Sequence, residues 1–113
     1  MEASAERVSM ICAKMLQFFI ETLNFTVSFE KEDDGSFTGS VEELDLFENA
    51  PSKNGCMILL LEAMKEYARD FYTEFDLWSS APNRREHIPY VIKILSSPDK
   101  KLLEDMTCRA GEI

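Results

Sequence analysis

Four residues close together near position 87 have side chains that could do chemistry on a phosphate ester. Arg84 and Arg85 carry positive charge, and His87 and Tyr90 can exchange protons. Cleavage of a phosphodiester needs proton transfer and positive charge beside the phosphate, so one hypothesis is a small RNA-cleaving enzyme that uses these groups. Their proximity in sequence also fits a structural role or contact with a partner. The acidic chain would repel RNA, which favours the latter roles.

The sequence predicts no metal site and no cofactor. Three cysteines, Cys12, Cys56 and Cys108, form no CxxC pair, and with one histidine they cannot give the usual zinc spacing. The acidic stretch from Glu30 to Asp34 lacks the alternating oxygens and distal glutamate of a calcium loop. The four glycines never cluster, so no phosphate-binding loop is expected.

Composition limits the class of protein. The chain has 113 residues, of which 45% are hydrophobic, and its net charge is -9. This size is typical of one globular domain, and the charge disfavours nucleic acid and anionic membranes as partners. No apolar run is long enough to cross a membrane, and the N-terminus does not resemble a secretory signal. Unpaired thiols favour the reducing cytoplasm.

Hydrophobic periodicity predicts the first half of the fold. Apolar residues at steps of three and four indicate a helix from Ala5 to Leu23, capped by Ser4, whose apolar face is wide enough for the core or for association. The period then changes to two, which predicts strands over 25–30 and 37–41 around a turn at Gly35. Leu44 and Leu46 indicate a short third strand.

A second, longer helix is expected from Ser52 to about Ser79, where Pro82 prevents continuation. Prolines divide the chain after residue 82 into short pieces. The run from Tyr90 to Leu95 fits either a helix or a strand, and Ser97-Pro98-Asp99 is a helix start.

Together these elements predict an α+β fold. It consists of an N-terminal helix, a three-stranded antiparallel sheet packed by a long helix, and a short helical C-terminal tail. We expect an α+β domain over residues 1–82 and a tail over residues 83–113 that packs on the domain or on a partner.

Two stretches resemble bacterial antitoxins. The acidic turn at Gly35, the Glu43-Leu44-Asp45-Leu46 strand and the helix after Ala50-Pro51 are similar to the sheet-and-helix module of HicB-type antitoxins. More distinctively, Glu66–Tyr72 followed by Ala81–Leu95, with its Pro-Asn-Arg-Arg-x-His-x-Pro-Tyr motif, resembles a RelB-like antitoxin family of RelE/RelB-type toxin–antitoxin systems.

The resemblance implies a non-catalytic protein that neutralises a small basic ribonuclease of RelE type. An acidic binder would be steered towards such a toxin. A second copy of the chain is a further candidate partner, and operator DNA, as in a DNA-binding autorepressor, is only weakly supported at this net charge. The candidate partner-binding residues are Trp78, Arg84, Arg85, His87, Tyr90 and Ile94.

Overall fold

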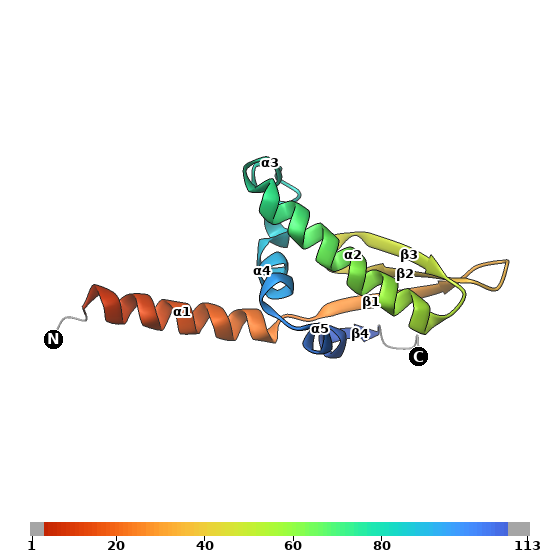
Figure 1. The fold of residues 1–113 in the computed structure, drawn as a ribbon, viewed down its shortest axis with the longest axis horizontal. Coiled ribbons are helices and arrows are strands. Elements are labelled where there is room, and N and C mark those ends of the chain that lie inside the picture. Colours follow the sequence, from red (N-terminus) through yellow and green to blue (C-terminus); the bar gives the residue numbers. More distant parts are fainter. Residues whose placement is uncertain (1–3, 109–113) are drawn as a thin grey trace.

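The computed structural model describes residues 4–108 and is an α+β fold with one helix that projects from the rest (Figure 1). The projecting helix α1 (Ala5–Thr22) confirms the helix predicted at the N-terminus. The Ser4 side chain caps it by accepting a hydrogen bond from the Arg7 N–H at 3.2 Å. Ile20 is its one buried residue, so nearly the whole helix lies outside the core.

The predicted hairpin is present as β1 (Phe25–Lys31) and β2 (Phe37–Val41), paired antiparallel with Val27 opposite Val41. Gly35 has φ +88°, the positive value that the turn requires. Asp34 Oδ1 accepts hydrogen bonds from the N–H and the Oγ–H of Ser36, which lower the pKa of this carboxyl. Local turn chemistry therefore fixes the register of the hairpin.

The third strand differs in part from the prediction. Leu44 lies in the short 3-10 helix η1 (Glu42–Leu44), with a fully buried side chain, and β3 (Leu46–Ala50) begins after Asp45. Asp45 has φ 55°, a left-handed conformation that ends η1 and redirects the chain. Alternation of Leu44 and Leu46 therefore reflects a turn of 3-10 helix followed by a strand.

The sheet also contains a fourth strand that the sequence did not reveal. β4 (Met106–Cys108) pairs with β1 in parallel, with Met106 opposite Phe25, which gives the strand order β3-β2-β1-β4. It directly follows α5 (Asp99–Asp105), the helix predicted from Ser97-Pro98-Asp99.

The long helix is shorter than predicted. α2 (Lys53–Thr73) is capped by Ser52, as expected, but it ends at Glu74 with φ -115° and ψ 46°. A separate short helix, α3 (Phe75–Ser79), follows. The break lets Trp78 fold back so that its ring stacks on that of Phe71, with centroids 6.1 Å apart. The apolar period continues through Trp78, so the sequence carries no signal for this break.

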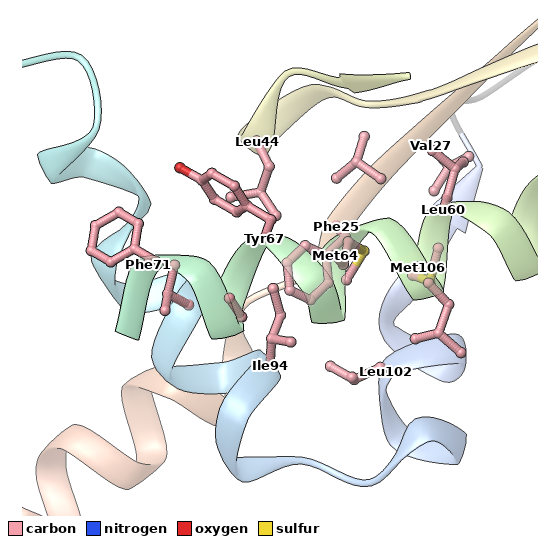
Figure 2. Close-up of a cluster of buried hydrophobic side chains, with 14 residues drawn as sticks. Phe25, Val27, Leu44, Leu60, Met64, Tyr67, Phe71, Ile94, Leu102 and Met106 are labelled. Carbon is pink, nitrogen blue, oxygen red and sulfur yellow. The ribbon is translucent and has the colours of Figure 1, made fainter. Parts of the chain in front are cut away.

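The run from Tyr90 to Leu95 is helical, as α4 (Ile88–Ser96), which follows the 3-10 helix η2 (Arg85–His87). Figure 2 shows the core in which α4, α5 and β4 meet α2 and the sheet. Val91 and Ile94 of α4, Leu102 of α5 and Met106 of β4 belong to the same buried cluster as Phe25 and Leu60. The C-terminal elements thus supply a share of the core of the domain.

A buried lysine joins α1 to this core. Lys93 is 1% exposed, and its Nζ donates hydrogen bonds to the carbonyl oxygens of Ile20, Glu21 and Leu23 at 3.3, 3.3 and 2.6 Å. These carbonyls lie at the C-terminal end of α1, where no N–H of a following helical turn is available to them. The Ile20 carbonyl also accepts from the Leu23 N–H at 3.2 Å. The same Nζ lies 2.7 Å from Asp105 Oδ2. Burial raises the pKa of Asp105, but hydrogen bonds from Lys93 and Lys101 outweigh it and lower the pKa overall.

Candidate partner-binding site

Three of the candidate partner-binding residues gather with Tyr67 where α2, α3 and η2 meet. The Tyr67 hydroxyl lies 2.6 Å from His87 Nδ1, and its ring contacts those of His87 and Trp78 edge-on, both with centroids 5.7 Å apart. The Arg84 guanidinium lies over the Trp78 ring at 5.2 Å and over the Tyr67 ring at 5.7 Å. We call Tyr67, Trp78, Arg84 and His87 the aromatic–arginine cluster.

The Tyr67 oxygen links Arg84 to His87. Arg84 Nη1 donates to this oxygen at 3.3 Å, and the Tyr67 hydroxyl can in turn donate to Nδ1 of a neutral His87. His87 is 5% exposed, and burial lowers its pKa, followed by the positive charge of Arg84, while Asp45 and Glu86 partly oppose the shift. We therefore assign a neutral His87 that accepts from Tyr67 through Nδ1 at pH 7. Sequence periodicity indicates Tyr67 only as a residue of the core stripe.

A fall in pH is expected to destabilise the protein through His87, the only histidine in the chain. Because the pKa of His87 is lower in the folded state than about 6.5 in the unfolded chain, the unfolded state binds the proton first. Stability is therefore full above pH 6.5 and decreases below it, by at most about 1.4 kcal/mol per pH unit, until pH reaches the folded-state pKa. Urea unfolding at pH 7.5, 6.5 and 5.5 measures this slope.

His87→Gln supplies the control, since glutamine keeps a hydrogen-bond acceptor but does not titrate. Asp34 and Asp105, whose pKa values are lowered from 3.8, change charge below this window. If the variant and the wild type lose stability equally between pH 6.5 and 5.5, His87 is not the group responsible.

The remaining candidate partner-binding residues, Arg85, Tyr90 and Ile94, lie in three different environments. Arg85 is exposed, and its Nε donates to the Ser79 carbonyl at 3.4 Å. Tyr90 packs its ring against Phe25, with centroids 5.6 Å apart, and burial together with Glu43 raises its pKa. Ile94 is 5% exposed and lies in the core. Of the four groups named for RNA cleavage, His87 and Tyr90 line a common depression, whereas the Arg84 guanidinium lies over the rings of Tyr67 and Trp78.

An acidic depression opens beside Tyr90 and His87. Its walls come from η1, η2 and α4 and from single residues beside them. The lining residues are Glu42, Glu43, Asp45, Asn83, Glu86, His87 and Tyr90. Glu43 is held by Thr26, whose N–H and Oγ–H donate to its two oxygens at 2.7 Å. Four carboxylates and a phenol thus share one concave surface, which suits a cationic group such as an arginine or lysine of another protein.

The part of the chain that the structure describes contains no group of three histidine, cysteine, aspartate or glutamate residues placed to hold a metal ion. None of the helices over residues 4–108 is long and apolar enough to cross a membrane. All three cysteines are free, with Cys56 buried and Cys12 and Cys108 exposed.

Comparison with known proteins identifies the relatives of this chain. A family model described as PHD-like, antitoxin of RelE/RelB toxin–antitoxin systems, matches residues 1–106. The fold is similar to a crystal structure from Syntrophomonas wolfei subsp. wolfei, described as the antitoxin part of a proposed toxin/antitoxin system. The two share 29% identity with a TM-score of 0.75 over 85% of this chain and 70% of that one. A search of curated protein sequences found no match.

Proposed function

Since the chain belongs to the PHD-like family of antitoxins of RelE/RelB toxin–antitoxin systems, we propose that it neutralises a basic ribonuclease toxin of RelE type by direct contact. A toxin that handles RNA needs positive surface charge, and a chain with net charge -9 attracts such a partner. The proposed role is non-catalytic, and its place is the cytoplasm, where free thiols stay reduced.

The observation that carries the proposal is the acidic depression next to the aromatic–arginine cluster. Glu86 lies on its rim with an exposed side chain, and Tyr90 is half-buried on its wall. Carboxylates beside a half-buried aromatic side chain are typical of protein interfaces that bind basic side chains. Arg84 and Arg85 lie between Asn83 and Glu86 of this surface in the sequence, and the Arg84 guanidinium covers the Trp78 ring; all three are proposed contacts. His87 and Ile94, which are buried, are proposed to support it from within.

Charge reversal at Glu86 tests this proposal. Glu86→Lys places a cation where the toxin's own cations are expected, and we expect it to weaken binding about 10-fold or more, mainly through slower association. Any small basic protein encoded beside this chain that co-purifies with it serves as the partner, and its RNA cleavage is assayed with each variant.

Glu104→Lys is the matched control. Glu104 is an exposed acid on α5, outside the depression, and its reversal changes the net charge by the same amount. We expect it to change affinity by less than about 3-fold. Equal effects of the two reversals on affinity would show that binding depends on net charge and not on the depression. The proposal is overturned if no basic protein encoded beside this chain co-purifies with it or has its RNA cleavage inhibited by it.

A further inference from the structure

α1 exposes far more apolar surface than a helix of a folded protein in water normally does. Seven large apolar side chains of α1 are between 47% and 70% exposed: Val8, Met10, Ile11, Met15, Leu16, Phe18 and Phe19. Figure 1 shows why, since α1 extends away from the sheet and the other helices, and only its C-terminal end contacts α4. An apolar surface of this kind marks an interaction site.

All of these residues except Met10, which lies on the opposite side of the helix, form a stripe along it. Val8, Cys12, Met15 and Phe19 follow one another at steps of four, three and four, the spacing that keeps side chains on one face of a helix that pairs with another. Ile11 and Phe18 widen the stripe on one side, and Leu16 widens it on the other. A second helix is therefore the shape of partner that this face fits.

We propose that α1 pairs antiparallel with α1 of a second copy of this chain. With about 200 Å² for each fully exposed large side chain, the six residues of the stripe at about half exposure leave about 600 Å² per copy. That reaches the lower end of the roughly 600–1,000 Å² per partner of a standard protein interface. Exposed Ile92 and Leu95 of α4, the helix that contacts α1, add apolar surface on the neighbouring element.

Charge favours a second copy over a basic toxin on this face. α1 contains two acids, Glu6 and Glu21, and two bases, Arg7 and Lys14, so it has no net charge with which to attract a cationic partner. Most of the net charge of -9 lies in the residues after α1. The acidic depression, rather than α1, therefore has the potential that complements a basic protein.

Charge and side-chain size also select the antiparallel orientation. In a parallel pair, the two acidic domains would lie side by side at the same end and repel each other. In an antiparallel pair they lie at opposite ends of a helix of 18 residues, about 27 Å long. An antiparallel pair centred on the stripe places the small Val8 opposite Phe19 of the second copy, and Cys12 opposite its Met15. Each small side chain then faces a large one, so the pairs of facing side chains fill similar volumes.

A lysine in the stripe tests the association. Wild-type protein is expected to have the mass of two chains by light scattering at micromolar concentration. Met15→Lys buries a charge at the centre of the interface and is expected to weaken the dimer about 100-fold. Gln17→Lys is the control, since Gln17 lies on the polar side of α1, where it donates to Glu21 at 2.8 Å; it is expected to remain dimeric. Circular dichroism checks that both variants keep their helices.

Disulfide trapping tests the orientation. In a background with Cys12→Ser and Cys108→Ser, the pair Val8→Cys and Phe19→Cys in one chain is expected to give a covalent dimer under mild oxidation, whereas neither single cysteine does. Covalent dimers from Val8→Cys alone indicate a parallel pair and overturn the proposal. A wild-type protein that is monomeric by light scattering overturns the proposal as well. In that case, protection of α1 from hydrogen exchange only on toxin binding would assign this face to the toxin.

Discussion

Lys93→Met is expected to lower the free energy of unfolding by about 3 kcal/mol or more, because it removes one member of a buried ion pair. The Nζ of Lys93 is the donor to three carbonyl oxygens at the end of α1, and it lies 2.7 Å from Asp105. Methionine fills a similar volume but donates no hydrogen bond. The three carbonyls therefore lose the Nζ donor, Ile20 keeps only the N–H of Leu23, and Asp105 keeps only Lys101. Urea unfolding of both proteins at pH 7 measures the difference.

Lys101→Met is the matched control, because Lys101 pairs with the same carboxylate at 3.3 Å but is 43% exposed. Exposed ion pairs contribute about 0–1 kcal/mol to stability, so Lys101→Met is expected to lower the free energy of unfolding by no more than that. If Lys101→Met loses as much stability as Lys93→Met, burial of the ammonium group does not explain the loss.

The second large effect is expected from Leu102→Ala, which should lower the free energy of unfolding by about 2–5 kcal/mol. Leu102 is fully buried in α5, and Figure 2 places it in the cluster with Ile94 and Met106. Truncation leaves a cavity between the C-terminal helices and the core, so we expect a single unfolding transition that shifts as a whole. Fluorescence of Trp78 and far-ultraviolet circular dichroism should report the same midpoint.

Leu103→Ala on the same helix is the comparison, since Leu103 is 39% exposed and its truncation should cost less than about 1 kcal/mol. Two separate transitions in Leu102→Ala, one of them confined to the C-terminal helices, would show that residues 83–113 are a unit distinct from the domain.

Local signals predicted the parts of the fold that local forces determine. Ser4 and Ser52 cap their helices as predicted, and Gly35 has the positive φ that its turn needs. The break at Glu74 and the strand β4 were not predictable in this way. α2 ends where Trp78 gains contacts with Phe71 and Tyr67, and β4 is three residues long and pairs with a strand far away in the sequence.

The sequence named part of the candidate site but not its arrangement. Trp78, Arg84 and His87 were among the predicted partner-binding residues, and the structure brings them together around Tyr67. The position of Tyr67 in an apolar stripe gave no indication of a polar role. Lys93 does carry a signal in the sequence, since it is the one charged residue in the apolar run from Tyr90 to Leu95. A lone lysine in such a run is either at the surface or paired in the interior.

The parallel pairing of β1 with β4 has a consequence for the time course of folding. Phe25 and Met106 are neighbours in the sheet although 80 residues lie between them in the chain, whereas β1, β2, β3 and α2 follow one another closely. Closing so long a loop is entropically costly, so contacts between distant residues form late and slow the overall rate. The hairpin and α2 can therefore assemble while the chain is still being synthesised. Completion of the sheet, and with it the pairing of Lys93 with Asp105, waits until the last described residues have been added.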